Sequence, residues 1–196
     1  MRDVYKLPED LPVPIDDGAC DHLNGMHLPS ISLPSTAGQD ISLANISGMA
    51  ILYFYPMIGN PKSLPEDDWN LIPGARGCTP QSCAYRDNFD LFREKGVQIL
   101  GISAQSLAAQ AEAKNRLHLP FDLVSDGTFN LSHALRLPTF AYKGSKYIKR
   151  LSLVVIDGVI CKVIYPVFPS NSDADEILQW LDSDTPESFS NQGFEK

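Results

Sequence analysis

Short β-prone apolar runs that alternate with segments of helical character constrain the fold more than any other feature of the sequence. The runs cover residues 50–55, 97–103 and 121–124, and helical signals fill the segments 80–95 and 106–117 that follow the first two. Runs that are almost continuously apolar are typical of strands buried on both faces of a mostly parallel sheet. The alternation therefore predicts βαβ units.

The second half of the chain predicts an antiparallel pair of strands. Residues 150–156 and 159–164 flank Asp157-Gly158, which is a two-residue hairpin signal. A last amphipathic helix is expected at residues 173–181. Together these elements predict an α/β fold, a thioredoxin-like three-layer sandwich with a mixed central sheet.

The chain is expected to divide into an extension, one domain and a tail. Residues 1–27, rich in Pro, Asp and Gly, predict an irregular N-terminal extension, residues 28–182 the thioredoxin-like domain, and residues 183–196 a C-terminal tail. Within the domain, residues 57–72 form a loop insertion without apolar periodicity. Loops of this length act as lids or binding segments, and a disordered insertion is the alternative. Trp69 in this insertion either covers a site, anchors a partner or packs on the body of the domain.

Composition and charge restrict the class of protein. A formal net charge of −8 disfavours nucleic acid as a partner, and the basic stretch 143–150 is expected to be a solvated loop. No run approaches the ~18 to 20 apolar residues of a membrane span, and the first residues lack the apolar segment of a signal peptide. We therefore expect a cytoplasmic protein that binds neither nucleic acid nor a membrane.

Two of the four cysteines lie where a helix is predicted to begin. Thr79 can cap this helix and Pro80 suits its first position, so Cys78 lies beside free N–H groups and the positive end of the helix dipole. That environment stabilises a thiolate. Cys83 follows five residues later. Along an intact helix the two Cα atoms are roughly 8 to 9 Å apart, which exceeds the ~7 Å limit for a disulfide.

A disulfide between Cys78 and Cys83 therefore requires the first helical turn to unwind, which suits a transient bond better than a structural one. Two unrelated buried thiols are the alternative. A zinc site fits less well, because the spacing differs from the usual pattern and no His or further Cys lies close by in sequence. Cys161 is expected in the core and Cys20 as a bystander, and the four histidines share no spacing that suggests a metal site.

At these residues the sequence resembles a known family. The segment from Gly77 to Asn88, Gly-Cys-Thr-Pro-Gln-Ser-Cys-Ala-Tyr-Arg-Asp-Asn, is preceded by Phe-Tyr-Pro at residues 54–56. Both are similar to the active site of the bacterioferritin comigratory protein or peroxiredoxin Q branch of the peroxiredoxins. Residues 150–158 resemble the strand that carries the active-site arginine in the peroxiredoxin 5 branch, and the strand order agrees over residues 28–182.

The resemblance implies a thiol peroxidase that reduces hydrogen peroxide and small organic hydroperoxides. It assigns Cys78 as the attacking residue that becomes a sulfenic acid, Cys83 as its intramolecular disulfide partner, and Arg150 as the group that stabilises the thiolate and the peroxide. It also implies a thioredoxin-like or glutaredoxin-like donor, no metal or organic cofactor, and a monomer or homodimer. A thiol–disulfide carrier and a redox sensor without peroxidase turnover are rival functions for the same cysteines.

One position departs from the family pattern. The family has Thr or Ser three residues before the reactive cysteine, and Ala75 stands there in this chain. We expect Thr79, Ser63 or a backbone group to replace the missing hydroxyl, and either Pro56 or Pro73 to shield the sulfur. The residues expected to bind substrate are Gly77, Pro73, Ala75, Arg76 and Thr79.

Overall fold

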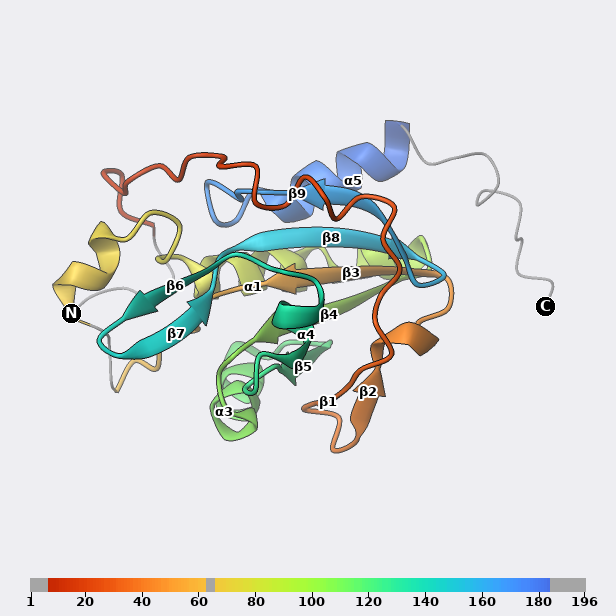
Figure 1. Cartoon of the computed structure of the whole chain (residues 1–196), viewed down its shortest axis with the longest axis horizontal. Helices are drawn as coiled ribbons and strands as arrows, with labels where there is room; N and C mark the ends of the chain where they lie inside the picture. The colour runs from red at the N-terminus through yellow and green to blue at the C-terminus, as the bar shows by residue number, and fades with distance from the viewer. Residues whose placement is uncertain (1–6, 63–65, 184–196) are drawn as a thin grey trace.

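A five-stranded sheet lies at the centre of the computed structural model, which describes residues 7–62 and 66–183 (Figure 1). Three neighbouring strands run parallel, the fourth is antiparallel to its neighbour among them, and the fifth is antiparallel to the fourth. In spatial order the strands are β5 (Asp122–Ser125), β4 (Val97–Ser103), β3 (Met49–Phe54), β8 (Leu151–Ile156) and β9 (Val159–Ile164). The predicted mixed α/β sheet is confirmed, because the apolar runs of the sequence are the buried strands.

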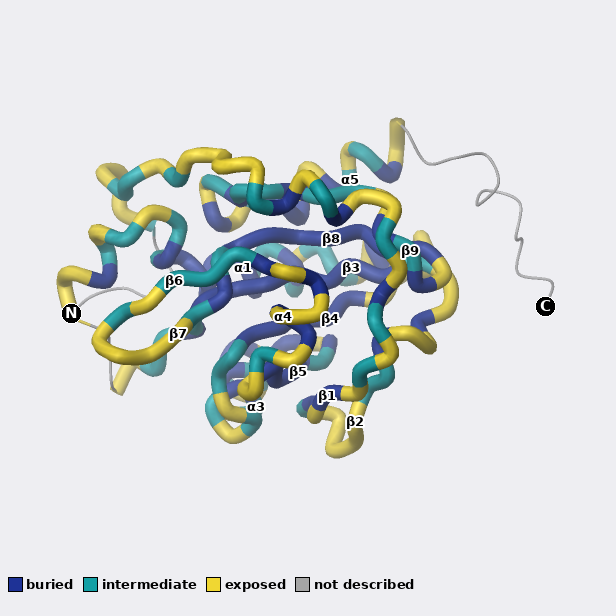
Figure 2. Tube along the Cα trace, viewed as in Figure 1, coloured by how far each residue is buried: buried dark blue, intermediate teal, exposed yellow. Residues whose placement is uncertain are grey.

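Side chains alternate along β3 and divide the core into two parts. Ala50, Leu52 and Phe54 belong to one apolar cluster, and Ile51 and Tyr53 belong to the other. Helices supply the opposing surfaces, so the molecule has three layers, with the strands as its most buried part (Figures 1 and 2). The helices are α1 (Cys78–Asp87), α2 (Phe89–Glu94), α3 (Leu107–Leu117), α4 (Asn130–Ala134) and α5 (Asp173–Ser183).

The two sides of the sheet are covered differently. Residues of α1, α2, α3 and α5 pack in the cluster that contains Tyr53. The other side packs against α4 and against the irregular segment before β3, which runs along the sheet with a bridge between His27 and Val159 (Figure 1). In the described part of the chain, none of the helices is both long and apolar enough to cross a membrane.

Two small hairpins lie outside the main sheet. One joins β1 (Ser32–Pro34) to β2 (Asp40–Ser42), and 3-10 turn η1 (Leu43–Asn45) follows it. The other joins β6 (Thr139–Tyr142) to β7 (Ser145–Ile148). The expectation of a solvated loop at 143–150 was therefore wrong, because residues 145–148 form β7 and Arg150 at the end of the stretch is buried.

The helix that carries the two cysteines differs from the prediction in two ways. It begins at Cys78 rather than after a Thr79 cap, and Gly77 precedes it with a φ of 106°. That conformation suits glycine, and a Cβ at this position would lie 1.9 Å from Ser170 Oγ. The helix also ends at Asp87, and a separate α2 begins at Phe89 instead of one helix running through residues 80–95.

The insertion at residues 57–72 is more ordered than a plain loop. Its 3-10 turn η2 (Asp67–Leu71) carries Trp69, which is buried against the β6–β7 hairpin. The Trp69 ring lies 5.8 Å from that of Phe140, 5.1 Å from Tyr142 and 5.0 Å from Tyr147 between centroids. The sequence does not reveal this turn, because its apolar partners lie some seventy residues further along the chain.

A glycine in β4 makes room for a tyrosine that supports α1. Tyr53 pairs with Gly101 across the parallel ladder, and a Cβ at Gly101 would lie 2.5 Å from the Tyr53 hydroxyl oxygen and 2.6 Å from Leu123 Cδ2. The Tyr53 ring stacks on Tyr85 of α1 at 4.6 Å between centroids. A glycine at position 101 is therefore required for the packing between sheet and helix.

Gly101→Ala should lower the free energy of unfolding by about 1 to 3 kcal/mol, because the new methyl group overpacks the core. Gly127→Ala is the matched control, since a Cβ there meets its nearest neighbour at 3.5 Å, and it should stay within about 0.5 kcal/mol of wild type. Urea unfolding of both variants measures the difference. Equal stabilities of the two variants would contradict this packing account.

Candidate active site

Cys78 is the first residue of α1, and its side chain is buried, with 2% of the residue exposed. Arg150 Nη2 donates a hydrogen bond to its Sγ at 3.2 Å, and the Met57 backbone N–H donates at 3.4 Å. The Cys78 thiol can itself donate to the Ala75 carbonyl at 3.6 Å. Hydrogen-bond donors from two separate segments thus converge on the sulfur.

The Arg150 guanidinium is held in place by backbone carbonyls. Arg150 directly precedes β8 and is 3% exposed. Besides the sulfur, it donates to the carbonyl oxygens of Gly74, Ala75 and Arg76, each at 3.3 Å. A buried guanidinium is tolerated only when its donors are satisfied, so these carbonyls fix both its position and the turn that leads into α1.

A buried carboxylate anchors the next side chain in this network. Gln81 of α1 accepts a hydrogen bond from Arg150 Nη1 through Oε1, and its Nε2 donates to Asp173 Oδ2 at 2.7 Å. Asp173 Oδ2 also accepts from Ser152 Oγ at 2.6 Å and from the Tyr85 hydroxyl at 2.9 Å. These bonds orient the Gln81 amide so that its oxygen faces the guanidinium.

Asp173 has an electrostatic environment unlike that of a surface carboxylate. It is fully buried at the start of α5, and this burial raises the pKa of its carboxyl, against the lowering effect of the hydrogen bonds from Ser152 and Gln81. Its Oδ1 has no hydrogen-bond partner among the residues that the structure describes. The sequence indicates only a helix start here, because nothing in a local pattern reveals donors from α1 and β8.

The inner face of α1 is attached to the sheet by further polar contacts. Ser82 Oγ and the Tyr53 hydroxyl are 3.0 Å apart, and the Tyr85 hydroxyl also lies 3.3 Å from Ser152 Oγ. All four side chains are fully buried. The helix that presents Cys78 is therefore fixed by several buried hydrogen bonds, each of which must break if the helix unwinds.

A narrow crevice leads to Cys78. It has a volume of only about 10 Å³, and Met57, Trp69 and Thr79 contribute to its lining together with the cysteine. Gly77 and Arg76 line it as well, and the Ala75 carbonyl lies 3.6 Å from the Cys78 sulfur. The structure thus brings four of the five predicted substrate-binding residues close to Cys78.

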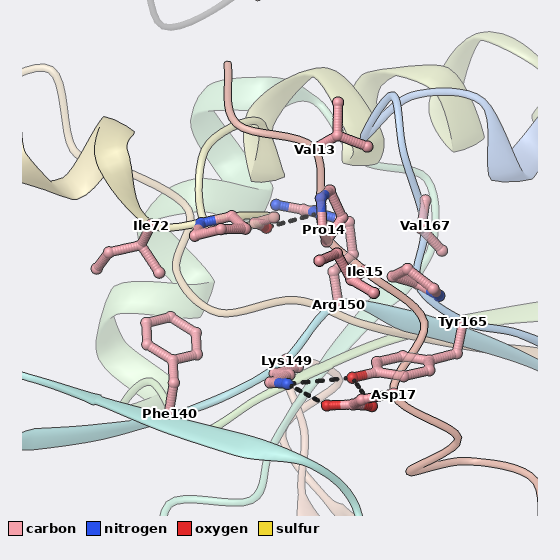
Figure 3. A pocket seen from close by; sticks show the side chains of 13 residues that line it. Val13, Pro14, Ile15, Asp17, Ile72, Phe140, Lys149, Arg150, Tyr165 and Val167 are labelled. Carbon is pink, nitrogen blue, oxygen red and sulfur yellow. Dashed lines mark hydrogen bonds and ion pairs between the residues drawn. The ribbon is translucent and has the colours of Figure 1, made fainter.

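Pro73, the fifth predicted residue, lies elsewhere. It lines a separate cavity of about 530 Å³, to which the N-terminal segment contributes Val13 and Ile15 (Figure 3). Pro56 is better placed to shield the sulfur, since it directly precedes Met57, whose N–H contacts Cys78. Ser63, one expected replacement for the missing hydroxyl, lies outside the described residues, whereas Thr79 lines the crevice.

The larger cavity is bounded by an ion pair that holds the N-terminal segment. Lys149 Nζ lies 2.9 Å from Asp17 Oδ2, and the Tyr165 hydroxyl donates to Asp17 Oδ1 at 2.8 Å (Figure 3). These hydrogen bonds lower the pKa of the Asp17 carboxyl to about 2. The lysine charge is thus balanced locally, and the remaining wall is mostly apolar.

The other cysteines have distinct environments. Cys83 is half-buried in the second turn of α1, and burial raises the pKa of its thiol. Cys20 is buried, and desolvation raises the pKa of its thiol to about 12, as befits a bystander. Cys161 is exposed on the edge strand β9, so its prediction as a core residue was wrong. The apolar run 159–164 does not show which side chains of an edge strand face outward.

Metal binding finds no support in the geometry. Within residues 7–62 and 66–183, no group of three or more His, Cys, Asp or Glu side chains is arranged to hold a metal ion. His22 instead contacts the Leu135 carbonyl through Nε2 at 2.9 Å.

Comparisons with known proteins agree with this geometry. The family model described as Redoxin matches residues 23–178. Peroxiredoxin Bcp of Escherichia coli (strain K12) is 29% identical over 158 residues, which cover 78% of this chain and 91% of the relative. Peroxiredoxin Q, chloroplastic, of Oryza sativa subsp. japonica is 33% identical over 103 residues, 52% of this chain and 41% of the relative. The chain thus spans less than half the length of the rice relative.

Solved structures show the same fold. Peroxidoxin BcpB from Mycobacterium tuberculosis superimposes with a TM-score of 0.68 at 23% identity, covering 83% of this chain and 98% of the other. The bacterioferritin comigratory protein of Xanthomonas campestris gives a TM-score of 0.62 at 21% identity, covering 88% of this chain and 98% of the other. The resemblance to peroxiredoxins that the sequence motifs indicated is confirmed.

Removing the buried carboxylate should destabilise the site and the fold together. Asp173→Ala should lower the free energy of unfolding by about 2 to 4 kcal/mol, because Gln81, Ser152 and Tyr85 lose a buried acceptor. Asp173→Asn keeps an oxygen for these donors and should lose less. Urea unfolding of each variant gives the values.

Asp175→Ala on the same helix is the control. Its carboxylate is exposed and accepts from Asn88 Nδ2 at 3.1 Å, so the variant should stay within about 0.5 kcal/mol of wild type. If Asp173→Ala were as stable as Asp175→Ala, the buried carboxylate would not anchor the network.

Proposed function

Because the chain belongs to the Redoxin family, we propose that it is a thiol peroxidase of the peroxiredoxin kind, with Cys78 as the attacking residue. The 3.2 Å contact between Arg150 Nη2 and Cys78 Sγ carries the proposal. A permanently charged guanidinium beside a buried sulfur at a helix N-terminus stabilises the thiolate, which is the nucleophilic form.

In the first step, the Cys78 thiolate attacks the terminal oxygen of a hydroperoxide. A sulfur–oxygen bond forms as the oxygen–oxygen bond breaks, and the departing oxygen takes a proton to leave as water or an alcohol. The sulfur is oxidised to a sulfenic acid. Arg150 and the first N–H groups of α1 are placed to stabilise negative charge on the sulfur and on the departing oxygen. The Thr79 hydroxyl, whose residue lines the crevice, is our candidate for the missing family hydroxyl.

In the second step, the Cys83 thiol condenses with the sulfenic acid, releasing water and forming the Cys78–Cys83 disulfide. Both residues belong to one continuous helix, so its first turns must unwind before the sulfurs can meet. Unwinding breaks the contacts of Gln81 with Arg150 and Asp173. The disulfide step therefore requires local unfolding of the structured site.

The cycle closes when two thiols of a reductant exchange with this disulfide and become oxidised themselves. We propose a thioredoxin-like or glutaredoxin-like donor, a monomeric or homodimeric enzyme, and the cytoplasm as its compartment. The half-buried thiol of Cys83 supports exchange at that sulfur once the helix has opened. A thiol–disulfide carrier or a redox sensor would form the same disulfide, so a measurement of peroxide turnover distinguishes a peroxidase from these two alternatives.

Cys78→Ser should abolish peroxide consumption, because the nucleophile is lost. Cys83→Ser should consume about one peroxide per protein and then stop, because the sulfenic acid has no internal partner. Stopped-flow mixing of reduced protein with hydrogen peroxide, followed by mass mapping of the disulfide, measures both results. Cys161→Ser is the matched control, since this exposed cysteine lies on another element and should leave turnover unchanged.

The same experiment separates the rival functions. A carrier predicts fast disulfide exchange with a slow peroxide reaction, and a sensor predicts a stable oxidised form that the thiol donor does not turn over. Full activity of Cys78→Ser would refute the proposed enzyme.

A further inference from the structure

The crevice above Cys78 is smaller than some of the substrates that a thiol peroxidase can use. Its volume of about 10 Å³ corresponds to the space that roughly one water molecule occupies. Hydrogen peroxide has two heavy atoms and can enter such a space end-on with small adjustments. An alkyl or aryl group on the peroxide oxygen needs several times this volume.

One wall of the crevice is the indole ring of Trp69, which its aromatic neighbours hold in place. Trp69 lines the crevice together with Cys78 and is 2% exposed. Its ring makes edge contacts with Tyr142 and Tyr147, at interplanar angles of 75° and 72°, and a tilted contact with Phe140. Aromatic contacts on one side and the crevice on the other leave the indole little freedom to move away.

The segment that carries Trp69 is also attached by polar contacts. The Tyr142 hydroxyl donates to Asp68 Oδ1 at 2.5 Å, and Lys143 pairs with Glu66. Both acidic residues lie within three positions before Trp69 in sequence, and their partners lie at the tip of the β6–β7 hairpin. Widening the crevice would therefore require separation of η2 from this hairpin.

The larger cavity does not offer a second route to the sulfur. Its volume of about 530 Å³ could hold an alkyl chain, but Cys78 is not among the residues that line it. Its lining includes Pro73, Gly74 and Arg150, and the Arg150 guanidinium also contacts the Cys78 sulfur. A hydroperoxide bound there would face the carbonyl-bonded guanidinium instead of the thiolate.

We propose that Trp69 determines substrate specificity, restricting attack at Cys78 to hydrogen peroxide and excluding hydroperoxides with bulky organic groups. This inference rests on the proposed peroxidase function and narrows its substrate class. The restriction is steric, so it acts on the size of the group attached to the peroxide and leaves the chemistry of the sulfur unchanged.

The test compares second-order rate constants for hydrogen peroxide and for cumene hydroperoxide by stopped flow. Wild type should favour hydrogen peroxide by at least about tenfold, the scale on which a pocket discriminates by shape. Trp69→Ala should reduce this ratio strongly and Trp69→Phe partly, through faster reaction with cumene hydroperoxide. Trp180→Ala, which removes the other tryptophan of the chain, should leave the ratio unchanged.

Each outcome has a distinct meaning. Equal rates for the two peroxides in wild type would overturn the role of Trp69 while leaving the proposed peroxidase intact. No reaction with either peroxide in wild type would instead refute the proposed function. If Trp69→Ala or Trp69→Phe lowers both rates in proportion, the tryptophan is merely structural and the inference fails. Should Trp69→Ala not fold, the wild-type ratio and the Trp69→Phe ratio decide the question.

Discussion

The contact between the Arg150 guanidinium and the Cys78 sulfur determines how the rest of the site is built. A buried cation has to satisfy all its donors, and this one does so with the sulfur, the Gln81 side chain and the carbonyls of Gly74, Ala75 and Arg76. Those acceptors lie on the turn before α1 and on α1 itself. The charge that we propose stabilises the Cys78 thiolate therefore also orders the turn before α1, where Gly77 supplies a backbone conformation that other residues rarely adopt.

In the proposed catalytic cycle, the hydrogen bonds that stabilise α1 oppose the unwinding that turnover requires. Gln81 lies between Arg150 and the buried Asp173, and Ser82 and Tyr85 attach the same helix to the sheet. The more firmly these contacts hold α1, the better the thiolate is positioned and the more slowly Cys83 can reach it. A helix held by several individually modest hydrogen bonds can open as a unit, because each contributes only about 1 kcal/mol net.

The sequence predicts those parts of the molecule that depend on local pattern. Continuous apolar runs identify β3 and β4, Asp157-Gly158 identifies the β8–β9 hairpin, and Gly77-Cys78-Thr79-Pro80 places the cysteine at a helix start. Contacts between residues far apart in the chain cannot be predicted from local sequence patterns. In the sequence Asp173 has the pattern of an ordinary helix start, and the basic stretch 143–150 gives no sign of the β6–β7 hairpin. Trp69 is buried only by aromatic partners far along the chain. The sequence did not predict the exposure of Cys161, because the apolar run 159–164 does not show which of its side chains face outward.

The central claim is that Arg150 keeps Cys78 in its anionic form, and the ultraviolet absorbance of the thiolate tests it most directly. At neutral pH, the difference spectrum between wild type and Cys78→Ser should show one thiolate per chain. The same signal should largely disappear in Arg150→Gln and persist in part in Arg150→Lys, with circular dichroism confirming that each variant is folded. A folded Arg150→Gln protein that retains the full thiolate absorbance would contradict the account.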